Sequence, residues 1–136
     1  MLQFERRVKD VEATIGVSLP PEHVRFLREG PPSLDEPVGV PFRGEVWDIS
    51  YFFRLDDGPN HKQLDKTCRL VSDVLPEHAL PVAEDHAGNF FCLFVAGPNA
   101  GRIVWWDHER DLGDDHVEDV APSLATFLTA LRPREE

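Results

Sequence analysis

The segment LPVAEDHAGNFFCLFVAGPNAGRIVWWDHE, residues 80 to 109, contains the clearest strand pattern in this chain. It contains three strand-like runs, at 80 to 83, 90 to 96 and 102 to 106, separated by EDHAGN and GPNAG. Both separators contain Gly and Asn, which tolerate the positive φ angles of tight hairpins. The stretch therefore predicts an antiparallel meander. Its second run, FFCLFVA, is apolar on both faces and is expected at the centre of the sheet.

Helical patterns precede this meander. Apolar residues between 4 and 15 recur at spacings of four, three and four, which predicts an amphipathic helix that ends near Gly16. Pro20 and Pro21 suit the first turn of a second, short helix that stops at Gly30. The chain is therefore expected to open as a helical hairpin.

Three further segments complete the pattern. Residues 47 to 55 alternate between apolar and mixed side chains, which predicts one strand that ends at DDGPN. Residues 64 to 75 return to helical spacing before Pro76, and residues 124 to 131 carry another helical stripe after Pro122 or Ser123. The prediction is an α+β fold, with a mainly antiparallel sheet of four or more strands. The helical hairpin, a middle helix and a C-terminal helix are expected to cover it.

Length and charge limit the classes of function. A chain of 136 residues, 41% of them hydrophobic, fits a single domain, predicted over residues 1 to 132 with a frayed tail at 133 to 136. Its 25 acidic residues exceed the 14 Lys and Arg, so the net charge is −11. This charge disfavours nucleic acid and anionic lipid as partners because both would be repelled. A protein with a basic surface is the partner that it favours.

The cysteines and the start of the chain bear on its location. Cys68 and Cys92 lie in apolar surroundings without a C-x-x-C motif, which predicts buried free thiols in a reducing compartment. The first residues, MLQFERRVKD, contain no apolar core of a signal peptide, and no apolar run of 18 residues occurs. The chain is therefore expected to be cytoplasmic, with no membrane partner.

The consecutive residues Asp107, His108 and Glu109 raise the question of an active site. Neighbours on a strand point to opposite faces, so these three side chains cannot bind one metal ion together. No phosphate-binding glycine loop, nucleophile motif or helical H-x-x-x-H spacing is present, so neither a catalytic site nor a metal or other cofactor is predicted. The alternative is a metal-dependent hydrolase that would combine separated residues: Asp85, His86, Asp107, His108 and His116.

An acidic run, DHERDLGDDHVED, occupies residues 107 to 119 and contains seven acids and one arginine. Such a run is either a solvated loop or a docking surface for a basic protein. If the strand before Asp56 and Asp57 runs in the same sense as the strand before Asp107, both acidic segments lie at one edge of the sheet. The predicted partner-binding residues are Asp56, Asp57, Asp107, Glu109, Asp111, Asp114 and Asp115.

The order of these segments resembles the SUKH superfamily, a family of cell-wall-assembly regulators and bacterial immunity proteins. VEATIGVSLPPEHVRFLREG is similar to its helical hairpin, and APSLATFLTAL to its terminal helix. The meander is similar to its P-I-A-x-D-x-x-G-N turn and its V-x-x-x-D-H-E strand end. The chain departs from the family at EGPP, where an Asn-Gly pair is common, and in the proline-rich segment 31 to 45. The matching motif residues include Glu12, Gly16, Pro20, Asp85, Gly88, Asn89, Asp107, His108 and Glu109.

The resemblance implies a SUKH-like domain that is not an enzyme. Its expected function is that of an immunity protein, which binds and neutralises a bacterial toxin such as a nuclease or deaminase. A regulatory scaffold that docks on cellular proteins is a further alternative, as for fungal relatives. The motif residues would then be structural. Asp107 and Glu109 are expected to accept hydrogen bonds from turn amides, with His108 on the other side of the strand.

Overall fold

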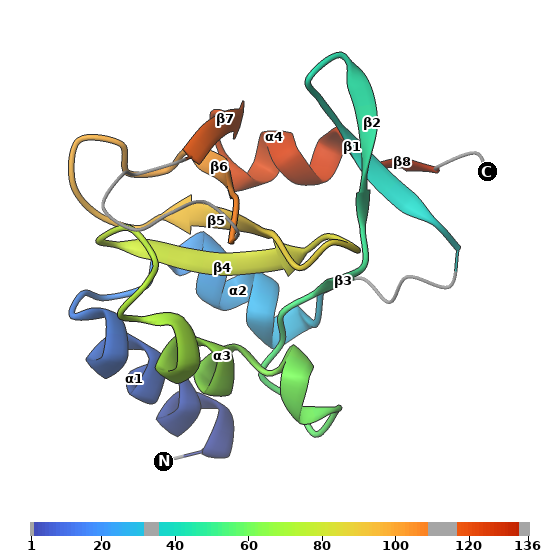
Figure 1. The fold of residues 1–136 in the computed structure, drawn as a ribbon. Helices are drawn as coiled ribbons and strands as arrows, with labels where there is room; N and C mark the ends of the chain where they lie inside the picture. The colour runs from blue at the N-terminus through green and yellow to red at the C-terminus, as the bar shows by residue number, and fades with distance from the viewer. Residues whose placement is uncertain (1, 32–35, 109–116, 134–136) are drawn as a thin grey trace.

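The computed structural model describes residues 2 to 31, 36 to 108 and 117 to 133 (Figure 1). Within these ranges it confirms an α+β fold in which helices cover an antiparallel sheet. The C-terminal tail beyond residue 133 lies outside the description. The helices are α1 (Gln3–Ile15), α2 (Pro21–Glu29), α3 (Leu64–Val71) and α4 (Leu124–Thr129), with the short 3₁₀ turn η1 (Asn60–Lys62) before α3.

The strands form two antiparallel sheets in the described part of the chain. The larger sheet has the order β3-β4-β5-β6-β7, and the smaller has the order β2-β1-β8. The larger sheet contains the predicted meander, with β5 at its centre and every residue of β5 buried. The bounds of the strands are β1 (Val38–Phe42), β2 (Glu45–Ile49), β3 (Tyr51–Phe52), β4 (Ala79–Glu84), β5 (Phe90–Phe94), β6 (Ile103–Trp106), β7 (Val117–Ala121) and β8 (Arg132–Pro133).

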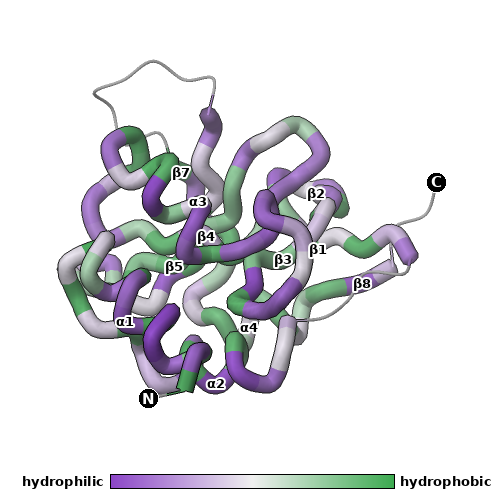
Figure 2. Tube along the Cα trace, turned by 90° about the horizontal axis from the view of Figure 1, so that it is seen from below, coloured by the Kyte–Doolittle hydropathy of each residue, from purple (hydrophilic) through white to green (hydrophobic). Residues whose placement is uncertain are grey.

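The central strand β5 separates two apolar clusters, because alternate side chains point to opposite faces of a sheet. Phe90, Cys92 and Phe94 face a cluster that includes side chains of α1 and α3. Phe91 and Leu93 face a second cluster, which α4 and the β1–β2 hairpin complete. Figure 1 shows α1 and α3 on one side of the meander and α4 on the other, and Figure 2 shows hydrophobic chain along much of β4 and β5.

The helical hairpin forms as predicted, and the structure shows how it closes. Gly16 ends α1 with a φ of 82°, a left-handed conformation that costs little only for glycine. The carboxylate of Glu12 then accepts a hydrogen bond from the Leu19 amide at 2.7 Å, which fixes the connection. The carbonyl of Pro20 accepts from the amides of His23 and Val24 and begins α2.

The predicted strand over residues 47 to 55 is wrong in its extent. The chain leaves the smaller sheet at Ile49 and enters the larger sheet at Tyr51. The physical reason is that Phe52 and Phe53 are both buried, one in each apolar cluster. A single strand with one apolar face would leave one of these rings in water.

Three further strands, β1, β7 and β8, were not predicted from the sequence. The proline-rich segment forms β1, and a tight turn at Arg43 and Gly44, both with positive φ, connects β1 to β2. Pro41 is tolerated because β8 pairs only with Val38 and Gly39. The end of the acidic run forms β7, which pairs with β6.

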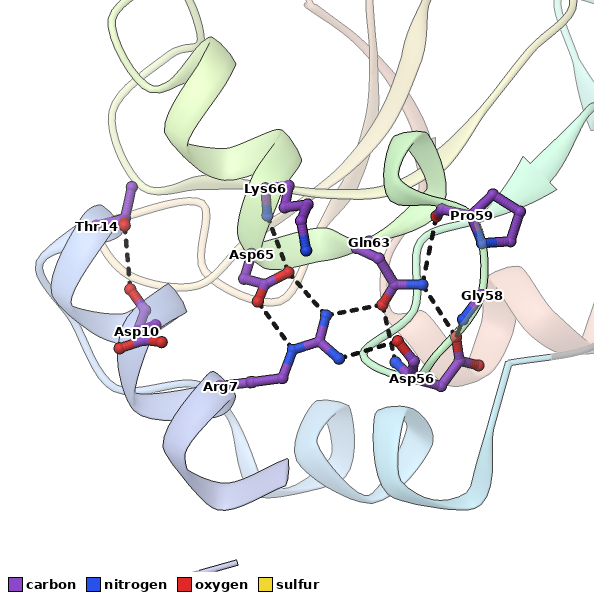
Figure 3. Close-up of polar contacts among 9 residues, drawn as sticks. All are labelled: Arg7, Asp10, Thr14, Asp56, Gly58, Pro59, Gln63, Asp65 and Lys66. Atoms are coloured by element: carbon purple, nitrogen blue, oxygen red, sulfur yellow. Dashed lines mark hydrogen bonds and ion pairs between the residues drawn. The ribbon is translucent and has the colours of Figure 1, made fainter. Parts of the chain in front are cut away.

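A buried ion pair connects α1 to the start of α3 (Figure 3). The guanidinium of Arg7 donates to both carboxylate oxygens of Asp65, at 2.9 and 3.0 Å, and to the side chain of Gln63 at 2.8 Å. It also donates to the Asp56 carbonyl at 2.9 Å. Burial by itself raises the pKa of Asp65, but the hydrogen bond and charge of Arg7 outweigh it and lower that pKa.

Arg7→Ala is expected to lower the free energy of unfolding by about 2 to 3 kcal/mol, because it leaves the buried Asp65 carboxylate without its counter-charge. Arg6→Ala is the matched control, since Arg6 is an exposed neighbour on the same helix. Urea unfolding of both variants measures the difference. Equal unfolding midpoints for the two variants would contradict the stabilising role of the Arg7 ion pair.

Candidate functional site

The signature residues of the meander meet at the turn between β4 and β5, residues 85 to 89, called the Asp85 turn below. Asp85 is only 2% exposed. Its Oδ1 accepts hydrogen bonds from the backbone amides of Ala87 and Asn89, both at 2.9 Å. Gly88 has a φ of 87°, which allows the chain to turn back so closely. The D-x-x-G-N motif thus folds the backbone around one carboxylate.

The other carboxylate oxygen, Oδ2, binds two tryptophans that are far apart in sequence. It accepts from the indole N–H of Trp47 at 3.0 Å and from that of Trp105 at 3.1 Å, and the Asn89 side-chain amide donates to it at 3.2 Å. Trp47 belongs to β2 and Trp105 to β6, so this carboxylate connects the two sheets. Burial raises the pKa of Asp85, but the hydrogen bonds from Trp47, Asn89 and Trp105 outweigh it and lower the pKa.

His108 attaches the end of β6 to the same turn. Its backbone amide donates to Asn89 Oδ1 at 3.1 Å, and its ring Nδ1 lies 2.7 Å from the same oxygen. The imidazole also lies against Gly88, where an added Cβ would approach it to 3.3 Å. His108 was expected on the far side of the strand, but it is a residue of the D-H-E motif that contacts the Asp85 turn. Glu109 lies outside the described residues.

Arg43, at the tip of the β1–β2 hairpin, covers the aromatic side chains beside this turn. Its guanidinium lies over the rings of Phe42, Trp47 and Trp105, 4.9 to 5.6 Å from their centroids. It also forms an ion pair with Glu118 of β7, and this hydrogen-bonded partner raises the pKa of Arg43. These cation–π contacts and the ion pair with Glu118 thus help to hold the hairpin over the larger sheet.

The predicted partner-binding acids do not lie along one edge. The strands β3 and β6 are three antiparallel steps apart in the sheet, so they run in opposite senses. Asp56 and Asp57 therefore follow one end of the sheet and Asp107 the other, and the expectation of a shared edge is wrong. The remaining predicted acids lie outside the described ranges: Glu109, Asp111, Asp114 and Asp115.

Asp56 has a local structural function. Its carboxylate accepts hydrogen bonds from Arg54, from the Gly58 amide and from the Gln63 side chain. Although burial raises the pKa of Asp56, these hydrogen bonds outweigh it and lower the pKa to about 2. In the acidic run, Glu118 pairs with Arg43, and Asp119 pairs with Arg102 at 3.0 Å.

Three residues of the hydrolase alternative, Asp85, His86 and His108, have other partners in the structure. The Asp85 carboxylate accepts hydrogen bonds from five N–H groups. The exposed His86 forms an ion pair with Asp48 of β2. Among the described residues, no three His, Cys, Asp or Glu side chains come together as a metal-binding group, and His116 lies outside the description. Cys68 and Cys92 are free and buried, and burial raises both thiol pKa values, that of Cys68 to about 12. A thiolate nucleophile is therefore disfavoured at either position.

His23 is a buried histidine that the sequence pattern did not single out. It is 1% exposed on α2, and neither ring nitrogen has a hydrogen-bond partner among the residues that the structure describes. Burial lowers its pKa from the ordinary 6.5 to about 4, because the charged form would lose its hydration. The ring packs beside Phe26, at 5.7 Å between centroids.

Between pH 6.5 and 4, the unfolded chain binds a proton on His23 that the folded chain does not bind. The stabilisation by neutral His23 is therefore complete above pH 6.5 and is lost as the pH falls, by up to about 3 kcal/mol near pH 4. His23→Leu should remove this part of the acid sensitivity, whereas the control His61→Gln, at an exposed histidine, should keep it. Urea unfolding at a series of pH values measures the difference, and parallel profiles for His23→Leu and the unaltered chain would contradict it.

These features define an α+β module whose signature polar residues hold backbone segments together. The chain belongs to the SMI1/KNR4 family (SUKH-1), which matches residues 5 to 130. It is 27% identical over 149 residues to the SPbeta prophage-derived uncharacterized protein YokK of Bacillus subtilis (strain 168), a match that covers 96% of this chain and 75% of that protein. No solved structure matches the chain. Among the described helices, none has the length and apolar composition needed to cross a membrane.

Proposed function

We propose that this chain is a non-catalytic, protein-binding module of the immunity type, which binds and neutralises a toxin with a basic surface in the bacterial cytoplasm. The observation that carries the proposal is the family match over residues 5 to 130, since immunity proteins are widespread in this family. The match to a prophage-derived protein supports a bacterial setting. Two free, buried thiols suit a reducing compartment.

The geometry of the Asp85 turn supports a binding module over an enzyme. Three polar residues of the signature, Asp85, Asn89 and His108, are each engaged in a hydrogen bond that holds the fold. A general acid or base must instead be free to reach a substrate proton. A hydrolase would have to use other residues.

The charge of the chain supports a basic partner. A net charge of −11 increases the rate at which this chain encounters a cationic protein. The same charge repels nucleic acid, the substrate of a nuclease toxin. We propose that residues 107 to 115, with the acids Asp107, Glu109, Asp111, Asp114 and Asp115, contribute most to this attraction. Asp56 and Asp57 would act separately, at the other end of the larger sheet.

The experiment that tests the function has two steps. The tagged chain is used to capture its partner from a strain that carries the native locus, and the captured protein is identified by mass spectrometry. The partner is then expressed in a sensitive host with and without this chain. Growth arrest by the partner alone, with growth restored by co-expression, is the expected result. A partner that is harmless to the host would instead favour the regulatory scaffold.

The hydrolase alternative requires a separate measurement. Protein purified without chelator is expected to contain no stoichiometric zinc, manganese or iron by elemental analysis. Bound metal, together with hydrolytic activity that is lost in His86→Ala, would refute the proposed function. His86 is suitable because it is exposed and its substitution leaves the buried hydrogen bonds of Asp85 in place.

Reversing Asp111, Asp114 and Asp115 to lysine is expected to slow association with the captured toxin and to reduce the salt dependence of binding, with little change in stability. The matched control reverses the exposed acids Glu5, Asp10 and Glu77, which lie elsewhere in sequence. Association rates at several ionic strengths are measured by surface plasmon resonance. If both triple variants behave alike, the acidic run is a solvated loop with no special part in binding.

A further inference from the structure

A groove of about 460 Å³ lies between α2 and α4, and no residue of the Asp85 turn lines it. Its apolar surface comes from Phe26 of α2 and from Leu124, Ala125 and Leu128 of α4. Phe26 and Leu128 are partly exposed here, while their inner sides pack on the apolar cluster that contains Phe127. Figure 2 shows the two helices as neighbours in the view from below. The side chains that form the groove therefore rest on the packed core.

Charged side chains of α2 flank this apolar surface on one side. Glu22, Arg25 and Glu29 line the groove, and in the described ranges none of the three forms an ion pair. Two of the three are acidic, which agrees with the sign of the whole chain. Unpaired charges beside an apolar centre are the usual arrangement of a protein interface, with an apolar core and a polar rim.

The groove suits a protein segment better than a small ligand. A small-molecule site normally has several converging polar groups that orient the ligand. Here the charged groups, Glu22, Arg25 and Glu29, all lie along one helix and do not converge. The hydroxyl of Ser123 is already used, since it accepts from the Thr126 amide at 3.1 Å and donates to the Thr126 hydroxyl at 3.0 Å. A second copy of the chain is disfavoured because two molecules of charge −11 repel each other.

We infer that the α2–α4 groove is the anchoring site for an amphipathic, lysine- or arginine-bearing segment of the partner protein, whose apolar side chains contact Phe26, Ala125 and Leu128 while its cations pair with Glu22 and Glu29. The inference rests on the proposed function, and it assigns the groove to the stability of the complex and the acidic run to its formation. The acidic run accelerates encounter, whereas the groove slows dissociation because its apolar contacts are desolvated.

The probe is a synthetic helical peptide with leucines at i, i+3, i+4 and i+7 and lysines beside them, labelled for fluorescence anisotropy. Ala125→Arg places a long charged side chain in the groove from an exposed helical position. The matched control is Ala13→Arg, which adds the same charge at an exposed position of α1. A second pair compares Glu22→Lys with Glu5→Lys, because both glutamates lie in the first turn of a helix.

The peptide is expected to bind the unaltered chain and Ala13→Arg equally, and to bind Ala125→Arg at least about tenfold more weakly. Glu22→Lys should weaken binding at low salt, whereas Glu5→Lys should have little effect. Unchanged circular dichroism and unfolding midpoints confirm that each variant is folded. Absence of binding to the unaltered chain, or equal binding to both arginine variants, overturns the inference. A dimer in light scattering that Ala125→Arg dissociates overturns it too, since the occupant is then a second copy.

Binding and protection measurements with the captured partner distinguish a failure of this inference from a failure of the proposed function. If Ala125→Arg binds the toxin as tightly as Ala13→Arg and still protects the host, the immunity function stands and the groove is not the interface. If the captured partner is no toxin, the immunity function fails while the peptide measurement still decides the groove. Faster dissociation from Ala125→Arg, with an unchanged association rate, is the result expected when both hold.

Discussion

Asp85→Asn is expected to lower the free energy of unfolding by about 4 kcal/mol, a large effect for an isosteric change of one side chain. The carboxylate accepts five N–H groups, three of them at Oδ2, from Trp47, Asn89 and Trp105. An asparagine has only one side-chain oxygen, so its NH₂ group must face one of the two sets of N–H donors. Those buried N–H groups lose their acceptor, and each unsatisfied group costs about 1 to 3 kcal/mol.

Urea unfolding followed by tryptophan fluorescence measures this change, because Trp47 and Trp105 both contact the altered side chain. Asp73→Asn is the control, since Asp73 is exposed in the turn after α3 and its substitution should change stability by less than about 0.5 kcal/mol. The β1–β2 hairpin should also detach more readily in Asp85→Asn, which hydrogen exchange of the β2 amides detects. A stability equal to that of Asp73→Asn would show that Asp85 does not connect the sheets.

Phe91→Ala is expected to cost about 3 to 5 kcal/mol, because it removes a completely buried ring from the central strand. Phe91 lies on β5 opposite Trp105, and its ring contacts that of Phe127, 5.4 Å away between centroids. Strands on both sides and α4 on top leave little freedom for the surroundings to fill the space. The cost therefore includes a cavity as well as lost apolar burial.

Two comparisons make the Phe91 prediction specific. Phe91→Leu keeps most of the apolar volume and should cost less than about 1.5 kcal/mol. Phe4→Ala removes the same ring from a partly exposed position on α1 and should also cost less. A double-mutant cycle with Phe127→Ala isolates the coupling of the two rings. If Phe91→Ala were no more destabilising than Phe4→Ala, the central position of β5 in the core would be refuted.

Local patterns predicted the elements that each form from one continuous segment. The helical spacing up to Gly16, the prolines before α2 and the Ser123 cap of α4 all act within a few residues, and the structure confirms them. The meander followed from three apolar runs with short, Gly- and Asn-containing connections. Strong local signals of this kind need no knowledge of the tertiary structure.

The smaller sheet was not predictable in this way. Its pairing of β1 with β8 joins residues more than 90 positions apart, and nothing in the local sequence of either segment indicates the other. The proline-rich segment was not assigned to any strand, whereas the structure keeps Pro41 in β1 at a position that β8 does not pair with. The relation of the two acidic segments also depended on the sense of strands β3 and β6, which only the topology settles.

Short-range spacing and residue type were enough to predict the fold class, the family resemblance and the position of the D-x-x-G-N turn. The contacts of Asp85, in contrast, depend on the tertiary structure. Its main partners, Trp47 and Trp105, lie 38 and 20 residues away and arrive from different sheets. Burial makes an unpaired carboxylate costly, and the fold that brings both indoles to Asp85 satisfies it and makes it a link between the two sheets.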